Sequence, residues 1–313
     1  MPNAQFAVFG AGGIGGYFSA VLTRAGYRVA LIARGQHLEA IRKSGLQVYS
    51  PKGDFTVGLA QATDDPAEVG PVDAVILAVK AWQVSDAARA MRPLLKAGTK
   101  VLPLQNGVEA SDQLEQVVGR EHTLIGMCRI ITAVAGPGAI REAGVQPTLA
   151  LGEPDGSALA PSARALAEAL AAAGVTVSTP SDIRAALWEK LLFIAAVSGA
   201  GAVARATLGE LRQCPPVREL LQELMIEVEA VARNRGIHLT PDVVSRALAF
   251  VDLMPATGTA SMQRDIADGK PSELEAIIGA VVRFSDAGGV ATPAMHYVYA
   301  SLLPQEHRAR KTV

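Results

Sequence analysis

The sequence predicts an α/β protein whose N-terminal parallel-sheet domain is followed by an all-helical domain, and three observations support this. The chain has 313 residues, which is enough for two domains of ordinary size. Its first half alternates short runs of β-branched and aliphatic residues with helical stretches, the pattern of a parallel sheet covered by helices. Beyond residue 180 the strand pattern nearly disappears. We therefore expect one domain over 1–180 and a second over 181–313.

The strands of the first half are read from short apolar runs, and the helices between them from wider periodicity. Asp73–Val79 is the clearest strand, because it continues as apolar residues after an acidic start, as a buried parallel strand does. The segment Ala139–Gly152 indicates a hairpin or short strands. The other expected strands are Gln5–Phe9, Arg28–Ala33, Lys100–Leu104, His122–Met127 and Val175–Ser178, and the helices are Ile14–Ala25, Gln83–Met91, Val108–Val117 and Ala158–Ala173.

The second half contains five expected helices. Thr240 before Pro241, and Ser272 before Glu273, are typical residues at helix starts. Pro180 marks the expected domain junction. The five helices are Ile183–Val197, Val217–Arg235, Pro241–Val251, Glu273–Ala287 and Pro293–Leu303.

Composition excludes several classes of protein. The hydrophobic fraction is 50% and the charged fraction 19%, which excludes a mostly disordered chain. Net charge is −1, from 29 basic and 30 acidic residues, so we expect neither nucleic acid nor an anionic membrane as a partner. Cys128 and Cys214 show no disulfide framework or metal spacing, which fits a reducing cytoplasm and no metal cofactor. The apolar run Leu191–Ala204 has 14 residues, fewer than the ~20 of a membrane span.

A glycine-rich turn after the first expected strand carries the strongest functional signal. Gly10, Gly12 and Gly15 form a G-x-G-x-x-G pattern, with Gly13 and Ile14 between the last two. Such glycines permit a tight turn and close approach of a pyrophosphate, and the following helix presents free N–H groups to it. Between a strand and a helix this pattern predicts a dinucleotide site in a Rossmann-type domain.

The end of the second expected strand selects the cofactor. An NAD site has Asp or Glu about 20 residues beyond the glycines, where it binds the ribose 2′-hydroxyl. Ala33 and Arg34 stand in that stretch instead. An arginine pairs with a 2′-phosphate through its planar fork, so we expect NADPH rather than NADH, the alternative being a solvated surface arginine.

Two further residues follow later strands. Lys80 comes after the strand ending at Val79 and can reach a cofactor phosphate, or it is a solvated lysine at a helix start. Asn106 offers an amide near the expected nicotinamide, although Asn-Gly is also an ordinary turn dipeptide. In the helical half, Lys190 interrupts an apolar helix. It is either a surface charge or an acid aimed into the cleft expected between the two domains, and Glu273 could pair with it.

Taken together and in this order, the motifs identify a family. The chain resembles the ketopantoate reductases (2-dehydropantoate 2-reductases) over nearly its whole length. The matching segments are GAGGIG, Arg34, KAWQV at Lys80–Val84, QNG at Gln105–Gly107, LWEKL at Leu187–Leu191, SMQRDI at Ser261–Ile266 and SELEAIIG at Ser272–Gly279. The resemblance implies a Rossmann domain, a helical domain like the C-terminal domain of 6-phosphogluconate dehydrogenases, and reduction of ketopantoate to pantoate with NADPH for pantothenate biosynthesis.

The resemblance also implies residue roles. Lys190 is the expected catalytic lysine and Glu273 its partnering glutamate. Asn106 is expected near both nicotinamide and substrate, and Ser261 at the substrate. The glycine turn, Arg34 and Lys80 correspond to the residues that contact the cofactor.

One departure concerns the lysine helix. Better-known members carry substrate-binding asparagines four and eight residues after the lysine, where this chain has Ile194 and Ser198. These positions share a helix face with Lys190, so the face is retained while an amide is lost. The loss of a hydrogen-bonding partner costs about 1–3 kcal/mol, which leaves the reaction class unchanged and the substrate open.

The expected chemistry is hydride transfer to the carbonyl carbon of a 2-oxo acid, with Lys190 protonating the oxygen and Glu273 orienting Lys190. Ser261 and Lys190 are the candidate donors to the substrate carboxylate, and Ser198 a further substrate contact. Two other hypotheses remain: a reductase of a different 2-oxo acid, with a less polar tail facing Ile194, and a non-catalytic NADPH-binding protein. The oligomeric state is open, a homodimer being the assembly considered.

Overall fold

The computed structural model describes residues 4–311, which form two compact units by their internal contacts. Within this range, the first unit contains residues 4–105 and 110–183, and the second contains residues 106–109 and 184–311. The described part confirms the predicted fold class, because the first unit contains a parallel sheet with helices and the second is helical.

A five-stranded parallel sheet forms the centre of the first unit, with strand order β5-β2-β1-β6-β7. The order reverses between β1 and β6, so the carboxyl ends of these two neighbouring strands form a switch point where ligands bind in open α/β sheets. The strands are β1 (Gln5–Phe9), β2 (Arg28–Ile32), β5 (Gln61–Thr63), β6 (Ala74–Leu77) and β7 (Lys100–Pro103).

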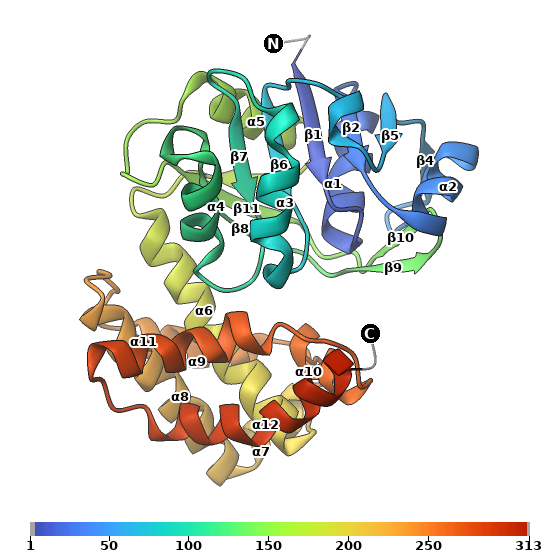
Figure 1. Ribbon diagram of the computed structural model, residues 1–313. Coiled ribbons are helices and arrows are strands. Elements are labelled where there is room, and N and C mark those ends of the chain that lie inside the picture. Colours follow the sequence, from blue (N-terminus) through green and yellow to red (C-terminus); the bar gives the residue numbers. More distant parts are fainter. Residues whose placement is uncertain (1–3, 312–313) are drawn as a thin grey trace. The chain divides into compact units, whose positions relative to one another are not determined.

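Helices cover both faces of this sheet, because alternate strand residues point to opposite sides. Phe6, Val8 and Ile76 face one apolar cluster, which contains residues of α1 and α5. Ala7 and Leu77 face the other, which contains residues of α3 and α4, the helices nearest the viewer in Figure 1. The helices are α1 (Gly13–Arg24), α2 (Gly35–Ser44), α3 (Val84–Ala90), α4 (Ala110–Val118) and α5 (Pro161–Ala172).

Two smaller sheets differ from the prediction. The strand expected at His122–Met127 is observed as β8 (Ile125–Arg129), which pairs antiparallel with β11 rather than extending the parallel sheet as a full strand. Of the two alternatives for Ala139–Gly152, short strands are observed rather than a hairpin, because the two strands belong to different sheets. The four-stranded sheet is β4-β3-β10-β9 and the three-stranded sheet is β12-β11-β8. Their strands are β3 (Leu46–Tyr49), β4 (Phe55–Val57), β9 (Thr132–Gly136), β10 (Ala139–Glu142), β11 (Thr148–Gly152) and β12 (Thr176–Ser178).

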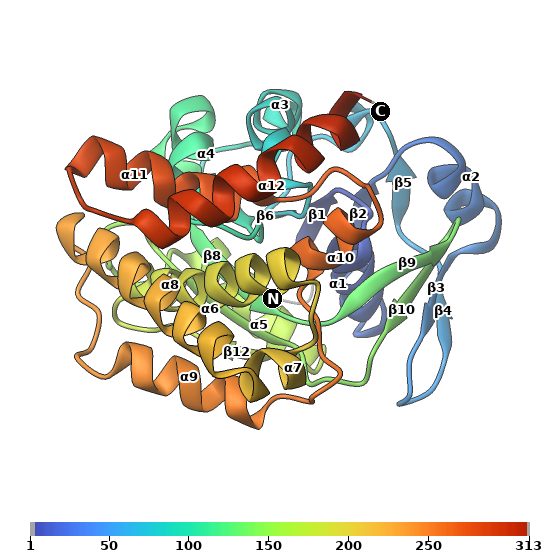
Figure 2. The same ribbon diagram turned by 90° about the horizontal axis from the view of Figure 1, so that it is seen from below.

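The long helix α6 (Ile183–Ala204) lies among the other helices of the second unit in both views (Figures 1 and 2). A helix that is apolar on all sides is buried, and glycines allow its neighbours to approach closely. A Cβ at Gly199 would lie 2.9 Å from Val298, and one at Gly201 would lie 2.6 Å from the Gln263 side chain.

This helix is longer than predicted, so its length no longer excludes a membrane span. The helix α6 has 22 residues and contains an 18-residue window with a mean hydropathy of 1.5. It is thus long and apolar enough to cross a membrane by length and composition, the one such helix in residues 4–311. However, 72% of its most apolar window is buried within the protein, which favours the core helix of a soluble protein.

The remaining helices also differ in their bounds. Asp242, rather than Thr240, precedes the helix expected at Pro241–Val251. The helix expected at Glu273–Ala287 begins with a π-helical turn over Glu275–Gly279. The last helix continues through Pro304 to Lys311. The helices are α7 (Leu208–Gln213), α8 (Pro215–Asn234), α9 (Val243–Leu253), α10 (Ser261–Ala267), α11 (Ala280–Gly288) and α12 (Pro293–Lys311), of which α7 and α10, like α2 in the first unit, were not expected.

Candidate active site

The glycine turn between β1 and α1 is built by close backbone contacts. Gly10 has φ +106°, and a Cβ there would lie 2.9 Å from the carbonyl oxygen of Ala78, just beyond β6. A Cβ at Gly15 would lie 1.9 Å from the carbonyl oxygen of Gly10. Glycine is therefore required at both positions, and the turn lies at the switch point of the sheet.

The same turn leaves space where a phosphate would approach. Gly12 is exposed, and a Cβ there would have nothing within 4 Å. Gly12 is also the N-cap of α1 and, having no side chain, makes no capping hydrogen bond. The N–H groups of Gly13 and Ile14 thus stand at an uncapped helix N-terminus, which favours an anion.

The predicted cofactor-contacting side chains follow neighbouring parallel strands. Ile32 at the end of β2 is paired with Phe9 at the end of β1, and Arg34 follows two residues later as the exposed N-cap of α2. Lys80 is exposed after β6, with Nζ 5.8 Å from the centre of the Trp82 ring. Both basic residues are therefore near the carboxyl edge of the sheet.

Gln105 is a residue of this edge to which sequence reasoning assigned no role. Its Nε2 donates to the carbonyl oxygens of Leu77 at 2.9 Å and Val79 at 3.0 Å, which fixes the orientation of the amide. Its Oε1 then points away from both carbonyls, is buried, and has no hydrogen-bond partner among residues 4–311. A buried acceptor of this kind costs about 1–3 kcal/mol unless a donor satisfies it. The glycine turn, the bases and this acceptor fit a dinucleotide.

The helical unit contains the predicted acid–base residues, which are buried. Lys190 on α6 is 7% exposed, and Ser198, on the same face, is 2% exposed. Ile194 between them is half-buried. Ser261 is the exposed first residue of α10.

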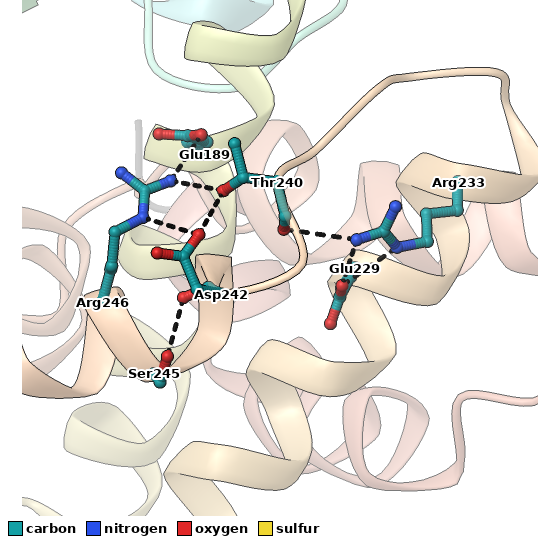
Figure 3. A network of polar contacts seen from close by, with 7 residues as sticks. All are labelled: Glu189, Glu229, Arg233, Thr240, Asp242, Ser245 and Arg246. Carbon is teal, nitrogen blue, oxygen red and sulfur yellow. Dashed lines mark hydrogen bonds and ion pairs between the residues drawn. The ribbon is translucent and has the colours of Figure 1, made fainter.

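Two contacts fix α6 beside Lys190. The Trp188 ring packs 5.9 Å from the ring of Phe284 on α11. The Glu189 Oε1 accepts a hydrogen bond of 2.9 Å from Arg246 on α9, within the network of Figure 3. Because successive residues are about 100° apart on a helix, these two contacts define the rotation of α6 and hence the direction in which Lys190 leaves it.

Asn106 and Glu273 are brought together although 167 residues separate them in sequence. The Asn106 Nδ2 donates to the Glu273 Oε2 at 2.9 Å. Glu273 is 8% exposed and precedes the π-helical turn, and such turns are frequent at functional sites. The pairing of Lys190 with Glu273 and the substrate roles of Ser198 and Ser261 remain predictions. No group of three or more His, Cys, Asp or Glu side chains in the described range could hold a metal ion.

Comparisons with known proteins identify the family of the chain. The family model described as ketopantoate reductase PanE/ApbA matches residues 6–156, and its C-terminal counterpart matches residues 182–306. A 2-dehydropantoate 2-reductase of Halobacterium salinarum is 31% identical over 292 residues, 93% of this chain and 95% of that protein.

Solved structures give the same result. A PanE/ApbA family ketopantoate reductase of Ralstonia eutropha superposes with a TM-score of 0.89 at 34% identity, covering 98% of this chain and 99% of that one. A D-mandelate dehydrogenase in a ternary structure with NADH and anilino(oxo)acetate superposes with a TM-score of 0.87 at 25% identity, covering 98% and 99%. With both family models matched in order along the chain, the protein belongs to the ketopantoate reductase family of oxidoreductases.

Proposed function

We propose that the protein is a cytoplasmic, NADPH-dependent reductase that converts ketopantoate to pantoate for pantothenate biosynthesis. The observation that carries the proposal is the buried Glu273 carboxylate, held by Asn106 in the unit that also buries Lys190. The other unit supplies a glycine turn that fits a dinucleotide. Such a pairing of a buried acid–base set with a cofactor turn is expected of a reductase rather than of a protein that only binds NADPH.

The proposed mechanism assigns a separate task to each side chain. When bound, the reduced nicotinamide supplies a hydride to the carbonyl carbon of the 2-oxo acid. Lys190 stabilises the negative charge on the carbonyl oxygen and donates the proton that completes the alcohol. Glu273 orients the ammonium group, and Asn106 holds Glu273. Ser261 donates to the substrate carboxylate.

The proposed choice of NADPH is supported by Arg34. Its position at the N-cap of α2, directly after β2, is where an acidic side chain would bind the ribose of NADH. A guanidinium group there pairs with a 2′-phosphate. The D-mandelate dehydrogenase that resembles this chain is described with NADH, so the cofactor has to be measured for this protein.

A second candidate substrate is a 2-oxo acid with an apolar tail. The supporting observation is Ile194, which lies half-buried one helical turn after Lys190, where the family pattern has an amide. The candidate is supported by the similar D-mandelate dehydrogenase, which is described in a ternary structure with anilino(oxo)acetate, an oxoacetate that carries a ring. An isoleucine favours such a tail over a hydroxyl-bearing one.

The test is a panel of 2-oxo acids, scored by kcat/KM with NADPH for the natural protein and for Ile194→Asn. If ketopantoate is the substrate, activity on it is high and the substitution brings little gain, because Ser198, directly or through a water, already satisfies its polar group. The apolar alternative would instead be established if the natural protein had negligible activity on ketopantoate and Ile194→Asn raised its kcat/KM for ketopantoate, by an amount equivalent to about 1–3 kcal/mol of transition-state stabilisation. If the protein binds NADPH but turns over none of the 2-oxo acids, the remaining hypothesis is a non-catalytic NADPH-binding protein.

A further inference from the structure

Residues 106–109, here called the strap, belong to the helical unit although the chain on either side belongs to the sheet unit. The strap follows Gln105 and ends where α4 begins at Ala110. It is short, so its position within the helical unit has to be set by contacts along its length. Three such contacts connect it to the helix that begins after Glu273.

The first contact is made by Asn106. Its Nδ2 donates to the Glu273 Oε2 at 2.9 Å, and a carboxylate is an acceptor, so the nitrogen has to face it. Asn106 is half-buried and Glu273 is 8% exposed, which limits competition from water. The bond therefore restricts the rotamers of Glu273 for as long as the strap remains in place.

The second contact is steric and involves Gly107. This residue has φ +95°, and a Cβ there would lie 2.4 Å from the carbonyl oxygen of Ala276. Ala276 is part of the π-helical turn, whose backbone cannot give way as the end of a flexible side chain can. Only glycine lets the strap lie this close to the turn.

The third contact is made by Arg283 on α11. Its Nη2 donates to the Glu109 Oε2 at 2.7 Å, and its Nη1 donates to the Glu275 Oε2 at 3.1 Å. The Glu275 Oε1 also accepts from the hydroxyl of Tyr299 at 2.8 Å. Burial and this carboxylate raise the pKa of Tyr299 to about 12, so the phenol remains a donor at neutral pH. Arg283 thus joins the end of the strap to the π-helical turn.

We propose that the strap is a positioning device for Glu273, in which Gly107 and Arg283 hold Asn106 against the carboxylate. The kinetic test of this inference rests on the proposed function, because in the proposed mechanism Glu273 orients Lys190. Loosening the strap frees Glu273 to leave the orientation needed for proton donation, which lowers kcat. Gly107 and Arg283 act through Asn106 and are positioning residues.

The first experiment compares Gly107→Ala with Gly236→Ala. Gly236 is in the same unit and has φ +76°, but a Cβ there would have nothing within 4 Å. Both variants carry left-handed strain, and only the first displaces the strap. We expect kcat to fall about tenfold or more for Gly107→Ala, a range common for a misplaced catalytic group, and to remain near the natural value for Gly236→Ala.

The second experiment does not depend on tolerance of an added Cβ. Arg283→Met removes the charge but keeps the length of the side chain, and Arg233→Met is its control, because Arg233 pairs with Glu229 outside the strap (Figure 3). Since Arg283 is 47% exposed, we expect a loss in kcat of about two- to fivefold, restored in large part by Arg283→Lys. The KM for the oxo acid should change less than kcat.

A structural readout separates this inference from the proposed function. In the free protein, hydrogen exchange of the 106–109 amides should accelerate in Gly107→Ala and Arg283→Met but not in the two controls. The inference that the strap positions Glu273 would be overturned by unchanged hydrogen exchange in these variants, or by a crystal structure of Gly107→Ala that keeps the Asn106–Glu273 bond. Either result would decide the question whatever the activity. If the natural protein reduces no 2-oxo acid, the proposed function fails, and the exchange and the crystal structure still decide the inference.

Discussion

The two units present their functional groups by different means. In the sheet unit, the candidate cofactor site is largely backbone: glycine is required at positions 10 and 15, because an added Cβ would lie 2.9 Å and 1.9 Å from carbonyl oxygens, and Gly12 faces open space. In the helical unit, the candidate acid–base site consists of side chains, and Asn106 and Glu273 meet across 167 residues. A backbone site is therefore sensitive to an added Cβ, at Gly10 and Gly15 through the fold and at Gly12 through the bound cofactor, whereas a side-chain site is sensitive to a change of functional group.

The largest effect is expected at the side-chain site. Lys190→Ala should lower kcat by about 10²–10⁴-fold, the usual contribution of a general acid, while NADPH still binds. Lys190→Arg keeps the positive charge but holds its proton too tightly to donate it, so it should recover little activity. Steady-state kinetics with ketopantoate and titration with NADPH measure both quantities. Near-normal kcat in Lys190→Ala would make Lys190 a packing residue.

The next effect tests the backbone site with two glycines of the same turn. Gly15→Ala should destabilise the sheet unit strongly, because the Cβ would lie 1.9 Å from the Gly10 carbonyl oxygen. Gly12→Ala should leave the melting temperature nearly unchanged, since a Cβ has nothing within 4 Å, yet weaken NADPH binding about tenfold or more where the pyrophosphate approaches. Thermal unfolding and cofactor titration separate the two outcomes. Unchanged NADPH affinity in Gly12→Ala would contradict the assignment of Gly12 to the phosphate.

A smaller effect concerns the charge that selects the cofactor. Arg34→Ala should raise KM for NADPH by about 10–100-fold, the range of a hydrogen bond to a charged group, and KM for NADH much less. Kinetics with both cofactors at constant ionic strength measure the ratio. Gln36→Ala is the control, because Gln36 is also exposed on α2. If both cofactors lose equally, Arg34 does not contact the 2′-phosphate.

The smallest effects are those of two histidines, one in each unit, whose pKa values shift in opposite directions. Burial lowers the pKa of His37, opposed in part by the backbone carbonyls of Ala11 and Gly136. The Thr292 carbonyl, with Asp286 adding to its effect, raises the pKa of His296. The stability from His37 is therefore present above the unfolded pKa of about 6.5 and lost as pH falls, whereas that from His296 is present below it and lost as pH rises.

Thermal unfolding of His37→Gln and His296→Gln between about pH 5 and 8 checks these signs. The difference between the natural protein and His37→Gln should shrink on acidification, because the natural protein then has to protonate a disfavoured imidazole. The difference for His296→Gln should grow over the same interval. Parallel slopes for the two variants would show that one of the assigned directions is wrong.

The accuracy of the sequence prediction follows the same division. The strand β1 was predicted to the residue, and β2, β6 and β7 to within two residues at each end, because a buried parallel strand is an apolar run between turn residues. The strand at His122–Met127 was assigned to the wrong sheet, since an apolar run does not state its partner. The length of α6 was underestimated, because Ser198, Gly199 and Gly201 follow Val197, and serine and glycine are weaker helix formers.

The sequence by itself determined the fold class, the family and the dinucleotide turn, because these depend on local periodicity and on glycines whose function is conformational. Tertiary structure decided which side chains meet. Asn106 read locally as part of a turn, yet its amide binds Glu273, and Gly107 is required by a carbonyl oxygen of Ala276 far along the chain. Gln105 likewise gained a role only when Leu77 and Val79 were seen to accept its two donors. Contacts between distant residues depend on how the elements pack, and no local pattern records them.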